Sequence, residues 1–191
     1  PRLQRLFPHG LPREVLSAVL IFAFVLYPLV RSTYVWSQQT EAIHSERGSI
    51  RVMSVEAGKV RLILEQIRQN SARKDKILLI PWGAMYYFLT DRPPADRYLT
   101  YAPWELLDDS SDTERLSRIS QDPPRLIIID DVPQTVYFPG PKNRFGEAYC
   151  EEFNRWIWQN YVPVRSAENQ GRTLHFLIPR PRTGLPANPA P

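Results

Sequence analysis

Residues 76–81 read KILLIP, four consecutive apolar residues between a lysine and a proline. A second run of this kind, RLIIIDD, occupies residues 125–131. Short apolar runs that do not alternate with polar residues are typical of strands that are buried on both faces of a sheet. The two runs therefore predict strands over residues 77–80 and 126–129 in the interior of an α/β domain.

Segments with helical periodicity precede and follow these strands. Residues 58–73 and 112–121 have apolar side chains at helical spacing with charged residues between them, and residues 144–161 form an aromatic-rich segment of the same kind. Repeating helix–strand units favour a mostly parallel sheet covered by helices. We therefore expect a small three-layer α/β domain.

Two further strands are expected at the end of the domain. Residues 162–167 and 173–178 have strand composition and flank a short segment that contains Gly171. This pattern predicts a C-terminal antiparallel hairpin at one edge of the sheet.

The N-terminal part of the chain contains a charge-free apolar segment over residues 15–30, VLSAVLIFAFVLYPLV. Continued to Trp36, with Arg31 and the aromatic residues at the headgroup level, a helix over 13–36 is long enough to cross a bilayer. The core of a signal peptide and a buried soluble helix are the alternatives, but no small-residue cleavage site follows. The arginines before the segment place its N-terminal side in the cytoplasm by the positive-inside rule.

These features divide the chain into four parts. We expect a cytoplasmic or loop segment over residues 1–12, a transmembrane helix over 13–36, an extracytoplasmic α/β domain over 37–178 and a disordered proline-rich tail over 179–191. For a bacterial protein, the domain would then face the periplasm from the inner membrane. Because residue 1 is a proline and not a methionine, we also expect that the chain is part of a longer polypeptide.

Charge and motif content exclude several classes of protein. The net charge is +4, of which the first 36 residues contribute +3, so the domain itself is nearly neutral and does not resemble a nucleic-acid-binding surface. The lone Cys150 is expected to be a buried apolar residue. The sequence contains no nucleotide-binding, zinc-protease or nucleophile-elbow motif, and we expect no cofactor bound by this part of the protein.

Two acidic residues end the second apolar run. Asp130 and Asp131 follow a buried strand, and open α/β sheets bind ligands at the carboxyl ends of their strands. An acidic pair in this position also caps loops or faces water, and both interpretations stay open.

The most distinctive segment is YYFLTDRPPADRY, residues 86–98. The Pro-Pro pair fixes an extended backbone and displays Arg92 and Arg97 with little remaining conformational freedom. Guanidinium groups presented in this way suit a phosphate or a carboxylate. The alternative is that both arginines pair with Asp91, Asp96 or helix carboxyl ends and act as structural links.

With this segment, the sequence resembles the extracytoplasmic tail domain of bacterial polytopic glycosyltransferases of the GT-C superfamily, relatives of protein mannosyltransferases and aminoarabinose transferases. The resemblance rests on Tyr-Phe-Leu followed by an Arg-Pro-Pro loop and Arg-Tyr, on DPPRLIIID at residues 122–130, and on NRFGE at 143–147 before an aromatic helix. It covers roughly residues 64–164 and the preceding apolar helix. At Asp91 the sequence departs from this group, in which a small residue such as glycine is common.

This resemblance implies a multi-span enzyme that transfers a sugar from a polyprenyl-phosphate donor to an acceptor outside the membrane. The family's catalytic acidic residues lie in an upstream loop, so none is assigned to this chain. The resemblance implies that the domain covers the active site or positions the donor or acceptor, next to upstream membrane helices of the same protein. We expect Arg92, Arg97, Tyr98 and Arg144 to contact phosphate or sugar. A membrane-anchored periplasmic binding module without catalytic activity is the alternative.

Overall fold

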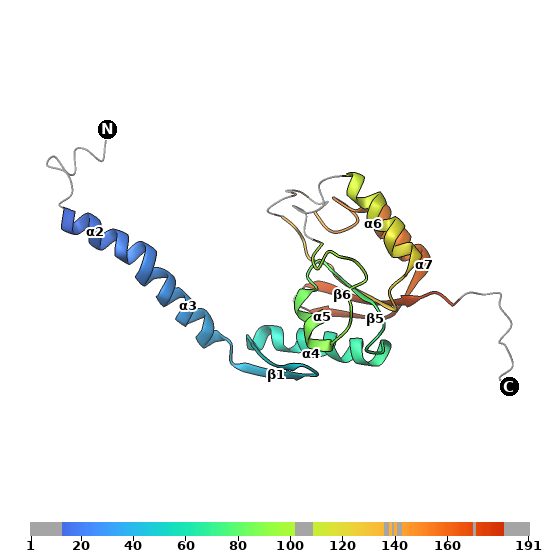
Figure 1. Ribbon diagram of the computed structural model, residues 1–191, viewed down its shortest axis with the longest axis horizontal. Helices are drawn as coiled ribbons and strands as arrows, with labels where there is room; N and C mark the ends of the chain where they lie inside the picture. The colour runs from blue at the N-terminus through green and yellow to red at the C-terminus, as the bar shows by residue number, and fades with distance from the viewer. Residues whose placement is uncertain are drawn as a thin grey trace. The chain divides into compact units, whose positions relative to one another are not determined.

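A computed structural model of the chain describes residues 13–101, 109–135, 138, 140, 143–169 and 171–181. The segment over 1–12 and residues 182–191 of the expected tail lie outside the described residues. The elements in chain order are α2(Arg13–Ile21), η1(Phe22–Leu26), α3(Tyr27–Gln38), β1(Glu41–Ser45), β2(Gly48–Val52), α4(Ser54–Asn70), β3(Ile77–Ile80), α5(Ala84–Thr90), α6(Asp109–Gln121), β4(Leu126–Asp130), α7(Glu151–Asn160), β5(Tyr161–Asn169) and β6(Arg172–Pro179) (Figure 1).

The chain divides into two compact units. The first contains Pro1–Ile43 and Ile50–Gly58, and the second contains His44–Ser49 and Lys59–Pro191. We describe each unit by itself.

The first unit contains a continuous apolar helix. The α2, η1 and α3 segments follow one another without a break, and η1 is a π-helical turn that ends two residues before Pro28. Ser17–Gln38, 22 residues, is long and apolar enough to cross a membrane by length and composition, and none of it is buried. The expected helix over 13–36 is therefore present and ends two residues later, at Gln38.

The second unit contains a four-stranded sheet with the order β3-β4-β6-β5. The β3 and β4 strands are parallel, with Ile77 paired to Leu126, whereas β6 is antiparallel to both β4 and β5. The sheet is thus mixed, and the expectation of a mostly parallel sheet is wrong. A run of apolar residues reveals that β4 is buried, but not the direction of its neighbour. The antiparallel C-terminal hairpin is confirmed, and its strand β6 lies inside the sheet while β5 forms the edge.

The outer edge of β3 is covered by the segment that follows α5. Ile77 N donates to the carbonyl of Pro93 at 3.1 Å, and Ala95 N donates to the carbonyl of Ile77 at 2.9 Å. Leu79 N donates to the Tyr87 hydroxyl at 2.9 Å. Because these bonds satisfy an exposed row of backbone groups, they close the edge to further strands.

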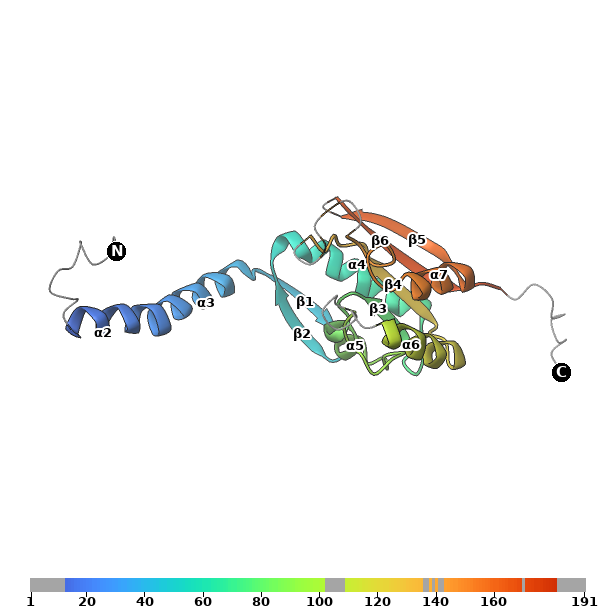
Figure 2. The same cartoon turned by 90° about the horizontal axis from the view of Figure 1, so that it is seen from above.

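Alternate residues of the strands pack on opposite faces of the sheet. One face contributes Leu78, Ile80, Ile127, Ile129 and Leu177 to a core cluster with Ile119 of α6 and with Phe153 and Ile157 of α7. On the other face, Leu79 and Ile128 line a small cavity with Ile63 of α4. Figure 2 shows α6, α7 and the strands from above.

Two predicted segments have different boundaries in the structure. The helix expected over 144–161 begins only at Glu151, because Gly146 (φ +79°) and Cys150 (φ +56°) have left-handed backbones that interrupt a helix. The segment 86–98, expected as a loop around the Pro-Pro bend, begins inside the short helix α5. At the C-terminus, β6 reaches Pro179, and Arg180 N donates to the carbonyl of Asn160 at 2.8 Å.

Candidate functional site

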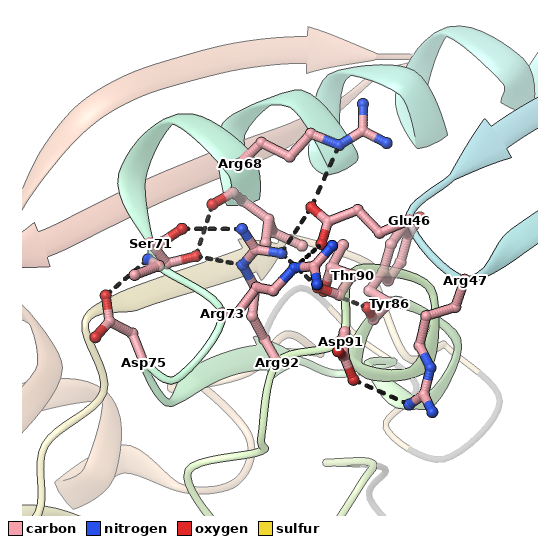
Figure 3. A network of polar contacts seen from close by, with 12 residues as sticks. Glu46, Arg47, Arg68, Ser71, Arg73, Asp75, Tyr86, Thr90, Asp91 and Arg92 are labelled. Atoms are coloured by element: carbon pink, nitrogen blue, oxygen red, sulfur yellow. Dashed lines mark hydrogen bonds and ion pairs between the residues drawn. The ribbon is translucent and has the colours of Figure 1, made fainter.

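Arg92, one of the two arginines beside the Pro-Pro pair, lies inside the second unit with 5% of its side chain exposed. Its Nε and Nη2 donate to the Oγ and the carbonyl of Ser71, both at 3.0 Å. Its Nη1 donates to Glu46 Oε1 at 3.0 Å and also to the carbonyl of Thr90. Figure 3 shows this guanidinium between the end of α4 and the turn that carries Glu46. Protein acceptors thus occupy the Arg92 guanidinium. They include a helix carboxyl end, at Thr90, but neither Asp91 nor Asp96, and the carboxylate partner is Glu46.

Glu46 is the shared acceptor of this network (Figure 3). Besides Arg92, it accepts from Arg73 Nε at 3.1 Å, and Arg68 Nε lies 3.8 Å away. Burial by itself would raise the pKa of Glu46, but hydrogen bonding and attraction to Arg92, followed by Arg73, hold that pKa below its ordinary value of 4.5. The carboxylate is therefore ionised at neutral pH and links the β1–β2 turn to the domain.

This lowered pKa predicts a pH dependence of stability. A carboxyl group with a lower pKa in the folded state stabilises the fold above its unfolded pKa, and this contribution is lost as the pH falls through the folded pKa. We expect the free energy of unfolding of the wild type to decrease below about pH 4.5 more steeply than that of Glu46→Gln. Thermal unfolding of the full chain in detergent micelles, followed by tryptophan fluorescence, measures this; parallel pH curves for the two proteins would contradict it.

Asp91 ends helix α5 in a left-handed conformation, with φ +54° and ψ +44°. Its carboxylate pairs with Arg47 Nη1 at 3.1 Å, and the Arg47 guanidinium lies over the Phe88 ring at 5.2 Å. A left-handed residue directly after a helix is usually glycine, and aspartate is one of the few other residues that adopt this conformation. The backbone at position 91 is therefore one that glycine adopts without strain.

The other arginine of the segment belongs to a group that we call the Asp96 cluster: Asp96, Arg97, Tyr98, Arg115 and Arg118. Arg97 Nη2 donates to the Tyr98 hydroxyl at 2.9 Å. The guanidinium groups of Arg115, Arg97 and Arg118 lie 4.4, 4.9 and 5.9 Å from the centre of the Tyr98 ring. Three cations thus surround one half-buried phenol.

Asp96 is the buried carboxylate that pairs with the arginines of this cluster. Its side chain is 1% exposed; Oδ1 accepts from Arg118 Nη2 at 3.1 Å and from Arg97 N at 2.8 Å, and Oδ2 accepts from the Tyr101 hydroxyl at 3.1 Å. Arg115 Nε lies 3.9 Å from Oδ2, and its side chain is also 1% exposed. Burial, followed by the Asp96 charge, raises the pKa of Tyr101, so Tyr101 remains a neutral donor.

The outer side of the cluster is accessible. The Arg97 side chain is 62% exposed and lies 3.6 Å from Glu114, which also pairs with Arg118. The hydrogen bond to Tyr98 raises the pKa of Arg97 above its ordinary value, and the guanidinium is cationic at neutral pH, as in any arginine. The three arginines of the cluster face the carboxylates of Asp96 and of the neighbouring Glu114, which leaves one excess positive charge and suits an anionic ligand group.

Arg144 lies at a different place in the domain. It is in the turn before α7, and its Nη1 donates to Asp131 Oδ2. Asp131 also affects His175, whose pKa is lowered by burial and raised to a smaller extent by the Asp131 charge. His175 Nδ1 lies 3.1 Å from Ser166 Oγ, and its ring packs edge-on against Trp158 at 5.5 Å.

The carboxyl ends of β3 and β4 border a small cavity of about 80 Å³, lined by Lys59, Trp82, Tyr86 and Asp130 together with apolar residues of the sheet and α4. Lys59 Nζ lies 3.6 Å from Asp130 Oδ2. Ligand pockets usually have volumes of roughly 300–1,000 Å³. A cavity of this size has room for water but not for a sugar.

Two members of the Asp96 cluster were missed by sequence reasoning. Arg115 and Arg118 are three residues apart on α6 and therefore share one helix face. This spacing was visible in the sequence, but which segment faces them was not. Among the described residues, no group of three His, Cys, Asp or Glu side chains is arranged to hold a metal ion.

Comparisons with known protein families, with curated proteins and with solved structures find no match for this chain.

Proposed function

We propose that this chain is the C-terminal part of an integral-membrane glycosyltransferase that uses a polyprenyl-phosphate-linked sugar donor. In this proposal, the helix Ser17–Gln38 is the last span in the bacterial inner membrane, and the α/β domain is a three-layer unit on the extracytoplasmic side. The catalytic acidic residues belong to the upstream part of the protein. The domain covers the active site and helps to position the donor.

The observation that carries this proposal is the hydrogen-bonded pair of the exposed Arg97 and the half-buried Tyr98, beside which Arg115 and Arg118 add positive charge. A polyprenyl-phosphate sugar presents an anionic phosphate beside a hydroxyl-rich ring. A guanidinium recognises the phosphate, and a phenol hydroxyl and ring recognise the sugar. We therefore assign donor contact to Arg97 and Tyr98. We do not assign donor contact to Arg92 or Arg144, because protein acceptors occupy the Arg92 guanidinium and Asp131 pairs with Arg144.

Two motif positions of the resemblance have conformations that fit it. Asp91 is left-handed at the position where the glycosyltransferase loops commonly have glycine. Gly146 of the NRFGE motif has φ +79°, and a Cβ atom placed there would lie 2.1 Å from Asn154 Nδ2. A side chain at position 146 would strain the left-handed backbone and would require the Asn154 side chain to move, which gives a physical reason for glycine in this motif.

Donor contact predicts a specific kinetic effect in the full-length protein. We expect Arg97→Ala to raise the KM for the polyprenyl-phosphate sugar by about tenfold or more, as for the loss of one charge-assisted hydrogen bond, with a smaller change in kcat. Arg97→Lys retains the charge, and its donor KM should lie between those of the wild type and of Arg97→Ala. Initial rates of sugar transfer in membranes, at varied donor concentration, measure this.

Arg155→Ala is the matched control, because Arg155 is an exposed arginine on α7 outside the cluster. An Arg97→Ala enzyme whose donor KM matches that of Arg155→Ala would overturn the assignment. Absence of transfer in the wild type as well would favour the anchored binding module.

A further inference from the structure

Helix α5 and its flanking residues display an apolar surface, which we call the α5 patch: Trp82, Met85, Phe88 and Leu99. These side chains are between 40% and 59% exposed. Met85 and Phe88 are three residues apart on one face of α5, whereas Tyr86, Tyr87, Leu89 and Thr90 are buried on the other. Both faces of this short helix therefore carry large nonpolar side chains.

Backbone pairing holds the remaining two residues of the patch together. Trp82 pairs with Thr100 in an antiparallel bridge, and Gly83 N donates to the carbonyl of Leu99 at 3.2 Å. Tyr101 N donates to the carbonyl of Pro81 at 2.7 Å. The patch is thus formed by neighbouring segments in a fixed arrangement. Large apolar side chains that are exposed on neighbouring segments are candidates for an interaction site.

We propose that the α5 patch contacts the lipid headgroup region of the membrane that holds the apolar helix. This inference rests on the membrane insertion of Ser17–Gln38 in the proposed function, but not on transferase activity. Only residues 39–43 separate Gln38 from the first residue of the second unit. The six Cα–Cα steps from Gln38 to His44 span at most about 22 Å. With the helix inserted, chain connectivity keeps the domain close to the headgroups, where local concentration favours even a weak contact.

The residue types of the patch fit this occupant. Tryptophan is enriched at membrane–water interfaces, and exposed phenylalanine, methionine and leucine insert at the boundary between headgroups and acyl chains. Arg47, over Phe88, and Arg97, two residues before Leu99, are both exposed and can contact lipid phosphates. Because Asp91 and Glu114 lie beside these arginines, we expect apolar insertion to dominate and the contact to persist at high salt.

Lipid-attached quenchers in proteoliposomes of the full chain test this proposal. A fluorescent label is placed at Ala84→Cys, on the exposed side of α5, and in a separate protein at Glu168→Cys on β5. The β5 strand is at the opposite edge of the sheet from β3, which leads into α5. The native Cys150 is buried and reacts poorly in the folded protein. Nitroxide lipids with the spin label at the headgroup should quench the Ala84 label several-fold more than the Glu168 label.

The patch itself is tested by the double substitution Met85→Ser and Phe88→Ser in the Ala84→Cys background. Both side chains are exposed, so the fold should be retained, and quenching should fall to the level of the Glu168 label. Equal quenching at the two labels, or quenching that the double substitution leaves unchanged, would overturn the proposal. Protection from aqueous iodide without lipid quenching would also overturn it, in favour of a protein partner.

Failure of the two proposals is distinguishable. Transfer activity without quenching of the Ala84 label removes only the lipid contact. Quenching without transfer activity removes only the enzymatic function.

Discussion

Replacing Arg92 with alanine is expected to lower the free energy of unfolding by about 3 kcal/mol or more. The substitution removes hydrogen bonds to Ser71, Thr90 and Glu46 and leaves the Glu46 carboxylate without its closest buried partner. Arg73 and Arg68 still attract that carboxylate, but both are much more exposed than Arg92. Thermal or urea unfolding of the full chain measures the loss.

Arg47→Ala is the control for this prediction. Arg47 follows Glu46 in the β1–β2 turn and pairs with the carboxylate of Asp91, but half of its side chain is exposed. Exposed ion pairs contribute only about 0–1 kcal/mol. An Arg92→Ala protein that is no less stable than Arg47→Ala would show that the network in Figure 3 does not hold the turn.

Replacing Asp96 with asparagine is expected to have a comparably large effect, about 3–5 kcal/mol. The side chain keeps its shape, but the negative charge that balances Arg115 in the interior disappears. Both side chains are 1% exposed, so water does not compensate for the lost charge. Unfolding experiments at neutral pH on the full chain measure this loss.

The matched control is Glu114→Gln, since Glu114 also pairs with Arg118 but has a side chain that is 59% exposed. We expect it to change stability by less than about 1 kcal/mol. If Asp96→Asn were equally mild, the buried pair would not stabilise the cluster. Arg97→Ala should raise the donor KM but lower the free energy of unfolding only slightly, because Arg97 is exposed. The effect of this substitution on binding is therefore separable from any effect on folding.

The sequence was most informative where apolar runs were short and bounded. The strand at Ile77–Ile80 was predicted with its observed limits, and the C-terminal hairpin was predicted from its turn. The antiparallel pairing of β6 with β4 was not predicted, because the order and direction of strands depend on long-range pairing that a local pattern does not encode. The late start of α7 depends on left-handed backbones at Gly146 and Cys150, and cysteine gives no signal for that conformation.

The candidate site was predictable only in part. The segment 86–98 pointed to Arg92 and Arg97, and their contact with phosphate or sugar stays a prediction. Their burial was not predictable: Arg92 is enclosed by Ser71 and Glu46, whereas Arg97 is exposed. Glu46 lies in a turn far from Arg92 in sequence, and nothing local connects the two. Arg115 and Arg118 likewise join Tyr98 through tertiary packing of α6.

The proposed function makes this domain part of an enzyme that transfers sugar from a polyprenyl-phosphate donor. Its most direct test is the transfer of label from a panel of polyprenyl-phosphate sugars by the full-length wild-type protein reconstituted in lipid vesicles. We expect protein-dependent transfer of label from at least one of these donors to an acceptor. No transfer above protein-free vesicles, with the full-length protein folded and inserted, would contradict it.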